Sequence, residues 1–118
     1  MSCLFNSMSH FIPESSSKIR QTICDYLQNG GKIIDGLDTK TILCFESKNY
    51  ISKMRQSSSW GGAIEIQSAC NIWKLRILVN DIRKRTKVSK VIEFQPVTNS
   101  YTKTIKLNWN GGHYTPVK

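Results

Sequence analysis

The sequence predicts one α+β domain, in which helices from the first part of the chain pack on a mostly antiparallel β-sheet from the second part. Apolar residues recur at helical spacing as far as Ile72, and they alternate with polar residues after Trp73. Helices that come first, with strands after them, are typical of α+β domains. The chain has 118 residues and no repeat or low-complexity linker, so we expect a single domain over residues 1–118.

Four helices are expected in the first part of the chain. Pro13 would end the first helix, and the serines at 15–17 would supply caps for the second. A glycine pair, Gly30-Gly31, would end the second helix, and another pair, Gly61-Gly62, would precede the fourth. The expected helices cover residues 3–12, the stretch from the serine caps through Leu27, a stretch near 47–55, and residues 63–72.

Four strands are expected in the second part. Branched residues dominate the first strand, and Ile105, Leu107 and Trp109 alternate strictly with polar residues in the third. A glycine pair, Gly111-Gly112, marks the turn before the last strand. Because such alternation is typical of antiparallel sheets, we expect mainly antiparallel pairing. The expected strands cover residues 75–79, 90–94, 102–109 and 113–117.

The composition argues against several classes of protein. No apolar run reaches the roughly 18 residues of a membrane span, so no membrane partner is expected. The first residues lack the basic and apolar regions of a secretory signal. Four cysteines, at positions 3, 24, 44 and 70, match neither a paired zinc-binding spacing nor a dense disulfide scaffold. We therefore expect reduced thiols, a cytoplasmic location (the host cytosol if the chain is viral), and no metal or other cofactor.

The chain is basic, with a formal net charge of +9, and its densest basic segment is DIRKRTKVSK at residues 81–90. Such a segment is either a binding patch for nucleic acid, an anionic membrane or an acidic protein, or a solvated connection between two strands. No aromatic residues interleave with the charges, which favours the solvated connection. Nucleic acid is therefore not the expected partner.

Cys3 is the candidate nucleophile because it stands where the first predicted helix begins. A thiolate is the reactive form, and a helix N-terminus or a neighbouring imidazole lowers the pKa of a thiol. His10 lies seven residues along the same predicted helix, about 10 Å away by helical rise. His113 lies in a late turn that can reach the thiol. The sequence therefore favours a dyad of Cys3 and His113. For Cys70 we expect only a small buried apolar side chain, and we expect the same for Cys24 and Cys44.

Three blocks of the chain carry a resemblance to a known family. Cys3-Leu4-Phe5, Trp60-Gly61-Gly62-Ala63-Ile64-Glu65-Ile66 and His113-Tyr114 occur in the order and approximate spacing of the ovarian tumour (OTU) family of cysteine proteases. The resemblance covers nearly the whole chain. It implies a papain-like α+β fold and hydrolysis of (iso)peptide bonds after the C-terminal glycine of ubiquitin or a ubiquitin-like modifier. Ubiquitin or such a modifier, with its conjugates, would be the partner of a monomeric enzyme.

The resemblance also implies roles for single residues. Cys3 would attack the carbonyl carbon of the scissile bond, and His113 would take the thiol proton and later protonate the leaving amine. The backbone N–H groups of Ser2 and Cys3 would form the oxyanion hole. Four residues would bind the Gly-Gly tail of the modifier: Trp60, Gly61, Gly112 and Tyr114. For Trp60, plain core packing is the alternative role.

Two positions depart from the family pattern. The family has Asp-Gly before its nucleophile, but here Met1 replaces the glycine and the aspartate would precede it. The family's orienting acid, two residues after the histidine, is Thr115, which carries no charge. Asn108 or Asn110 could orient the imidazole instead, as an asparagine does in papain-like proteases. Both could also be turn residues beside Trp109. A catalytically weak ubiquitin-binding module and, less favoured, a basic nucleic-acid-binding domain are the alternative functions.

Overall fold

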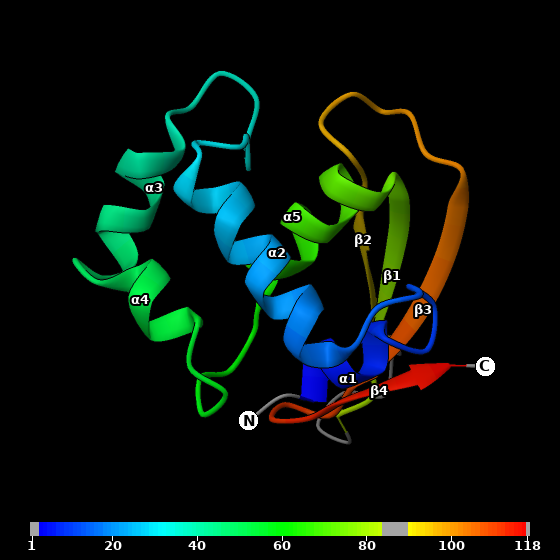
Figure 1. The fold of residues 1–118 in the computed structure, drawn as a ribbon. Coiled ribbons are helices and arrows are strands. Elements are labelled where there is room, and N and C mark those ends of the chain that lie inside the picture. Colours follow the sequence, from blue (N-terminus) through cyan, green and yellow to red (C-terminus); the bar gives the residue numbers. More distant parts are fainter. Residues whose placement is uncertain (1–2, 84–89, 118) are drawn as a thin grey trace.

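The computed structural model describes residues 3–83 and 90–117, and these residues form five helices followed by a four-stranded sheet (Figure 1). The predicted α+β class is confirmed, because helices and strands occupy separate parts of the chain. The helices are α1 (Cys3–Met8), α2 (Ser16–Gln28), α3 (Thr39–Glu46), α4 (Tyr50–Met54) and α5 (Ala63–Trp73). The strands are β1 (Leu75–Asp81), β2 (Lys90–Phe94), β3 (Lys103–Trp109) and β4 (Tyr114–Val117).

The sheet has the strand order β2-β1-β3-β4, and its pairing is mixed. The outer pairs, β1–β2 and β3–β4, are antiparallel as predicted, whereas the central pair β1–β3 is parallel. After β2 the chain passes the start of β1, where the Thr102 amide donates to the Lys74 carbonyl oxygen at 2.9 Å, and it then enters the sheet on the other side of β1. Since parallel neighbours end at the same edge, Asp81 and Trp109 become register partners.

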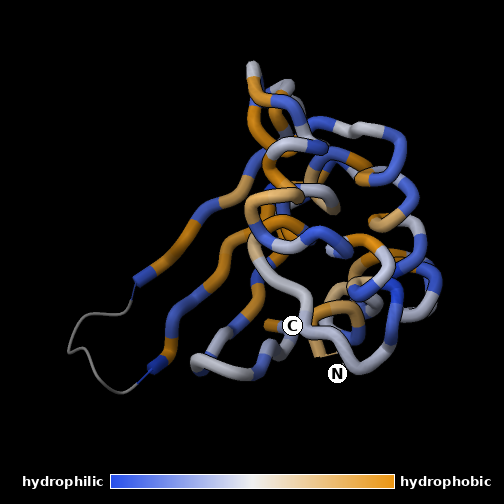
Figure 2. The backbone as a smooth tube through the Cα atoms, turned by 90° about the vertical axis from the view of Figure 1, so that its left-hand side faces the viewer, coloured by the Kyte–Doolittle hydropathy of each residue, from blue (hydrophilic) through white to orange (hydrophobic). Residues whose placement is uncertain are grey.

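The core lies between the sheet and the helices that cover one of its faces (Figure 1). Leu75, Ile77 and Val79 are the buried apolar residues of β1, and Ile105 and Leu107 of β3 join them. The alternation predicted from the sequence is thus an alternation between the helical side and the opposite side of the sheet. In Figure 2 the end of β1 and the start of β2 extend away from the helical layer.

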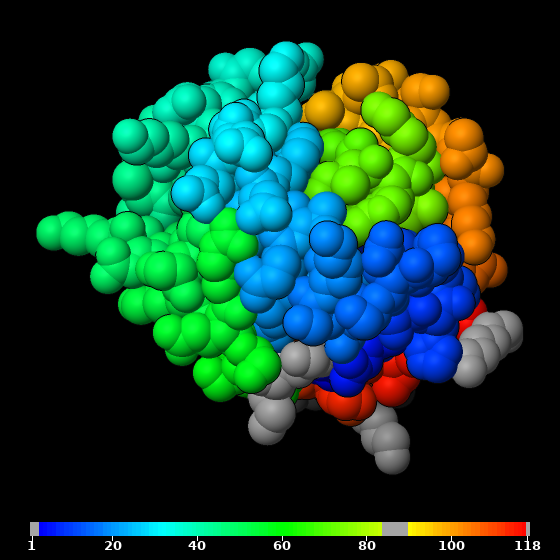
Figure 3. Space-filling view, viewed as in Figure 1, coloured from blue at the N-terminus to red at the C-terminus, as the bar shows by residue number. Residues whose placement is uncertain are grey.

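The two ends of the described chain meet. Figure 3 shows the first residues, in dark blue, against the last strand, in red, at the lower edge of the molecule. A helix that starts at Cys3 and a strand that follows His113 therefore pack together, although they are separated by almost the whole sequence.

Three helical expectations are corrected by the structure. The first helix ends at Met8 rather than at Ile12, and its last residues continue as turns, with the Phe11 and Ile12 amides both bonded to the Met8 carbonyl oxygen at 2.9 Å. Helix α3 was not expected, because its threonines and Ile42 favour strands. The Asp38 carboxylate caps α3 by accepting from the Thr41 amide at 3.2 Å. Helix α4 is shorter than the expected 47–55. No described helix is long and apolar enough to cross a membrane.

Candidate active site

Cys3 is the first residue of α1, and the burial of that helix determines its position. Leu4, Phe5 and Met8 are completely or almost completely buried, while Cys3 itself is half-buried. The first amides of a helix have no partner within the helix, so the Cys3 N–H is available to a ligand. Ser2, the other expected oxyanion residue, lies outside the described residues.

His113 follows the turn that joins β3 to β4. The Asn110 side-chain oxygen accepts hydrogen bonds from the Gly112 amide at 3.1 Å and the His113 amide at 2.9 Å. The Asn110 amide donates to the His113 carbonyl oxygen at 3.2 Å, and Gly111 takes a φ of 105° that favours glycine. The turn is thus fixed by its own sequence, and it leaves His113 exposed at the edge of the sheet.

Ser7 joins the segment that carries Cys3 to the segment that carries His113. Its hydroxyl oxygen lies 2.8 Å from the Cys3 carbonyl oxygen and 3.1 Å from the Tyr114 carbonyl oxygen, and both carbonyl oxygens accept from this hydroxyl group. Burial raises the pKa of Tyr114, and the nearby Cys3 and Glu65 raise it further. Both observations place the Cys3 end of α1 next to the residue that follows His113. Ser7 was not predicted from the sequence, although its position four residues after Cys3, on the same side of the helix, was a usable signal.

Gly61 packs against the same helix. A Cβ atom at Gly61 would lie 2.6 Å from Leu4 Cδ2 and 3.1 Å from the Phe5 ring, so any other residue here would have to displace these two side chains. Trp60 is 52% exposed and lies outside the core, so core packing does not explain it. The second sequence block therefore borders the nucleophile helix and leaves Trp60 open to solvent.

Glu65 ties this block to the interior. Its carboxylate is almost fully buried and accepts hydrogen bonds from the Gly62 amide at 2.7 Å and the Tyr50 hydroxyl at 2.5 Å. Burial raises the pKa of Glu65, and these two hydrogen bonds oppose that shift. The buried Arg20 guanidinium lies 4.3 Å from the centroid of the Phe5 ring and donates to the carbonyl oxygens of Met54 and Ser59 at 2.7 and 2.9 Å. Glu65 therefore supports the Gly61-Gly62 segment, and Arg20 supports α1.

The candidates for a third catalytic member are placed differently from one another. Asn110 uses its side-chain oxygen to hold the turn. The Asn108 side-chain oxygen accepts from Asn80 Nδ2 at 3.2 Å, and Asn108 is the register partner of Thr115 across the β3–β4 pair. Asn108 and Thr115 therefore lie on one face of the sheet, whereas Asn110 serves the backbone.

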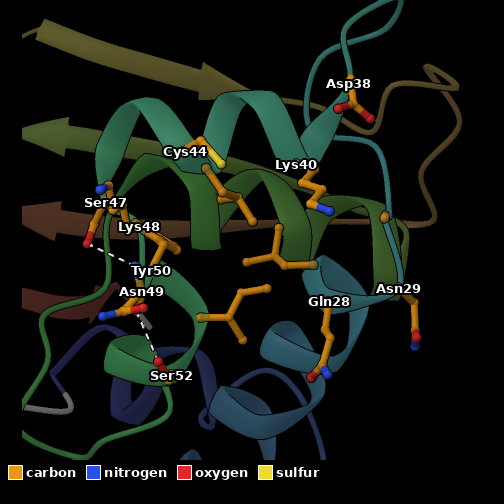
Figure 4. Close-up of a pocket in the computed structure, with 14 residues that line it drawn as sticks. Gln28, Asn29, Asp38, Lys40, Cys44, Ser47, Lys48, Asn49, Tyr50 and Ser52 are labelled. Atoms are coloured by element: carbon orange, nitrogen blue, oxygen red, sulfur yellow. Dashed lines mark hydrogen bonds between the residues drawn. The ribbon is translucent and has the colours of Figure 1, made fainter.

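The other cysteines differ from Cys3. Burial raises the pKa of Cys24 to about 11 and that of Cys70 to about 12, which suits the inert apolar role expected for them. The same expectation for Cys44 is wrong, because Cys44 is exposed on α3. It lines a hollow of about 550 Å³ between the end of α2, α3 and α4 (Figure 4). None of the predicted site residues lines this hollow, so it is separate from the candidate active site.

Arg83 lies in the predicted connection between two strands, β1 and β2, and its side chain is 45% exposed, but it also has specific partners. Its guanidinium binds the Asp81 carboxylate and lies over the Trp109 ring. The rest of the basic segment, residues 84–89, lies outside the described residues. Within the described part of the chain, no group of three or more His, Cys, Asp or Glu side chains could hold a metal ion.

A thiol at the start of a buried helix, with a histidine turn beside that helix, is the arrangement of nucleophile and base expected of an α+β cysteine hydrolase. The profile of OTU-like cysteine proteases matches residues 2–114, and the chain belongs to this family.

Individual relatives agree with this family. The chain is 27% identical to "Ubiquitin thioesterase OTU1" of Rattus norvegicus, covering 99% of this chain and 33% of that protein. It is 26% identical to the protein of the same name from Danio rerio, covering 99% of this chain and 38% of the relative. The chain thus spans about a third of the length of these curated relatives.

Solved structures have the same fold. An OTU domain in complex with ubiquitin superposes with a TM-score of 0.75 at 25% identity, covering 98% of this chain and 62% of that one. An OTU deubiquitinase from Wolbachia pipientis wMel, bound to ubiquitin, superposes with a TM-score of 0.65 at 18% identity, covering 99% of this chain and 89% of that one. The predicted OTU fold is confirmed.

Proposed function

We propose that the chain is a cysteine-dependent hydrolase that cleaves (iso)peptide bonds after the C-terminal glycine of ubiquitin or a ubiquitin-like modifier. The observation that carries the proposal is the Ser7 hydroxyl between the carbonyl oxygens of Cys3 and Tyr114, because it brings the family's cysteine and histidine blocks to one corner of the molecule. The names of the relatives, and the ubiquitin in two related structures, support this choice of substrate.

In the proposed mechanism, His113 removes the thiol proton and Cys3 Sγ attacks the carbonyl carbon of the modifier's last glycine. The N–H groups of Cys3 and Ser2 stabilise the oxyanion, and His113 then protonates the departing amine. Water hydrolyses the resulting thioester and releases the modifier with a free carboxylate. Each step uses only groups of this chain, the substrate and water.

The tail of the modifier is proposed to run between the two glycine pairs. Gly112 has open space where a side chain would stand, so an extended Gly-Gly segment can pass there, and the exposed Trp60 can cover it. Gly61 lets the chain after Trp60 pass close to Leu4 and Phe5 of α1. Tyr114, half-buried beside Trp109, would line the other side, next to a small apolar hollow of about 130 Å³ at the start of α5.

For the orienting member we propose Asn108 rather than Asn110 or Thr115. Asn110 already accepts two backbone hydrogen bonds, which uses both lone pairs of its side-chain oxygen. Asn108 accepts one bond, from Asn80, and stands diagonally across the strand pair from His113, within reach of a long side chain. Asn108→Ala should then lower turnover more than Thr115→Ala at equal stability.

We also propose a monomeric protein in the cytoplasm, or in the host cytosol if the chain is viral. The cytoplasmic location is supported by the four cysteines, all of which are free in the structure.

A ubiquitin probe with a thiol-reactive group at its C-terminus tests the proposal. Wild-type protein and the Cys24→Ala, Cys44→Ala and Cys70→Ala variants should be labelled, and Cys3→Ala should not. His113→Ala should lose several orders of magnitude in turnover of a fluorogenic ubiquitin substrate with little change in ubiquitin affinity, whereas His10→Ala should retain activity. Labelling that persists in Cys3→Ala would refute the assignment of the nucleophile. Tight ubiquitin binding by a wild-type protein that neither reacts with the probe nor cleaves the substrate would favour the non-catalytic binding module.

A further inference from the structure

The end of β1 lies beside the turn that carries His113. β1 and β3 are parallel, and their last residues, Asp81 and Trp109, are register partners. The Ile82 amide donates to the Trp109 carbonyl oxygen at 2.9 Å, which continues this pairing one residue beyond β1. The chain enters the His113 turn at the residue after Trp109. A contact that fixes the end of β1 therefore also restrains Asn110, the first residue of the turn.

Arg83 and Asp81 form a closed pair at this place. Arg83 Nε lies 2.9 Å from Asp81 Oδ1, and Nη2 lies 2.6 Å from Oδ2, so the guanidinium binds both carboxylate oxygens. The Arg83 backbone amide also donates to Oδ1 at 3.1 Å. The Asp81 side chain is only 7% exposed, and Arg83 lowers its pKa, with Lys90 on β2 adding to the effect. The carboxylate thus holds the guanidinium plane in one orientation.

The oriented arginine contacts the turn on two sides. Its guanidinium carbon lies 4.6 Å from the centroid of the Trp109 ring, a cation–π geometry. A Cβ atom at Gly111 would lie 3.2 Å from Arg83 Cδ, so the aliphatic part of Arg83 covers the turn directly. Trp109 in turn lies against Tyr114, with ring centroids 6.4 Å apart. Arg83 therefore contacts Trp109, before the turn, and Gly111, within it, and it reaches Tyr114 only through Trp109.

We propose that Arg83, oriented by Asp81, is a positioning residue that holds the turn and so keeps His113 within reach of Cys3. The inference rests on the proposed function, in which His113 acts on the Cys3 thiol. Arg83 touches neither the thiol nor the imidazole, so it acts only through the turn. Asn110 holds this turn from within, and Arg83 holds it from outside.

The role is one of geometry rather than of net charge. The Arg83 side chain is 45% exposed and the Asp81 side chain only 7%, so the pair stands between an exposed ion pair, which contributes little to stability, and a buried one. A planar guanidinium can bind a carboxylate with two bonds and stack on an indole at the same time, which an ammonium group cannot do. A lysine at position 83 would therefore keep the charge and lose the function.

Steady-state turnover of a fluorogenic ubiquitin substrate tests whether Arg83 acts through its geometry or through its charge. Arg83→Ala should lower kcat by about tenfold or more, because small misplacements of catalytic groups are costly, and leave KM within about twofold. Arg83→Lys should not restore kcat. Asp81→Asn, which keeps the arginine and weakens its anchor, should give an intermediate loss. Arg76→Ala is the matched control, because Arg76 of β1 pairs with Glu93 of β2 away from the turn, and it should behave as wild type. Recovery of kcat in Arg83→Lys, or a change confined to KM, would overturn the proposal.

A measurement without ubiquitin keeps this test separate from the proposed function. In a Cys44→Ser background, which removes the other exposed thiol, the rate of Cys3 alkylation by iodoacetamide reports its thiolate fraction. Arg83→Ala should slow alkylation at neutral pH towards the rate of His113→Ala, while Arg76→Ala should not. This result supports the positioning role even if the wild-type protein does not cleave ubiquitin conjugates. Equal rates in wild type and Arg83→Ala would overturn it even if the wild-type protein is an active deubiquitinase. Thermal unfolding of each variant confirms that the folded protein is compared.

Discussion

The two glycine pairs that border the site, Gly61-Gly62 and Gly111-Gly112, look alike in the sequence but are held by different forces. At the first pair the constraint is steric and comes from far away in the chain, because α1 leaves no space for a Cβ at Gly61. At the second pair the constraint is conformational and local, because Gly111 has a positive φ and Asn110 holds the turn. Gly112 itself has free space around it.

The supporting carboxylates differ in the same way. Glu65 supports the first pair from within the core, where burial raises its pKa. Asp81 supports the second pair through Arg83 at the edge of the sheet, where the arginine lowers its pKa. The nucleophile side of the site is therefore part of the core, whereas the histidine side is a surface hairpin held by polar contacts. Substitutions on the nucleophile side should mainly lower the free energy of unfolding, and substitutions on the histidine side should mainly lower turnover.

The largest effect is expected for Glu65→Ala. This change leaves the Gly62 amide and the Tyr50 hydroxyl without their acceptor and removes the negative charge near the buried Arg20. Removing one member of a buried charged network costs about 3–5 kcal/mol. Urea unfolding should show this loss, and a loss below about 1 kcal/mol would mean that Glu65 does not support the core.

Gly61→Ala should come next. The added methyl group would push Leu4 and Phe5, and overpacking of this kind costs about 1–3 kcal/mol. Because Cys3 precedes these residues, turnover should fall as well. Gly62→Ala is the matched control, since a Cβ there would meet only the Glu65 carboxylate oxygen, at 3.9 Å. Equal stability of the two variants would contradict the steric explanation.

Gly111→Ala should destabilise by a similar amount and lower turnover more. A non-glycine residue at this positive φ costs about 1–3 kcal/mol, and the methyl group would also displace Arg83. Gly112→Ala should change the free energy of unfolding by less than about 0.5 kcal/mol and should raise KM, because the position is free of neighbours and faces the proposed tail channel. A Gly111→Ala protein with wild-type kcat would show that the turn need not be held.

Lowering the pH should change the contributions of Glu65 and Asp81 to the free energy of unfolding in opposite directions. This is the smallest of the expected changes in stability. Glu65 has a raised folded pKa, so its contribution is complete below its unfolded pKa of about 4.3 and is lost as pH rises through the folded value. Asp81 has a lowered folded pKa, so its contribution is present above about 3.9 and is lost as pH falls through the folded value.

Urea unfolding at several pH values between about 3 and 7 checks this pair of signs. As the pH falls, the stability advantage of wild type over Glu65→Gln should grow, while its advantage over Asp81→Asn should shrink. If both stability advantages grew, or both shrank, as the pH falls, the two folded pKa values would be shifted in the same direction and the predicted signs would be wrong.

Much of the fold could be predicted from local patterns. Ser15 caps α2 as expected, with its side chain accepting from the Lys18 amide, and the β2 bounds agree with the prediction. Helix α3 could not be predicted in this way, because its β-branched residues favour strands and its cap, Asp38, lies in a loop without other signals. The exposure of Cys44 followed from that missed helix.

The sequence by itself determined the class of the domain, the helix start at Cys3 and the glycine turn before His113, because spacing, caps and turn residues act over a few positions. Only the tertiary structure decided the parallel pairing of β1 with β3, the Ser7 link between Cys3 and Tyr114, and the placement of Arg83 against Trp109 and Gly111. These contacts join residues that are far apart in the chain, and no local periodicity encodes which distant partner a side chain will meet.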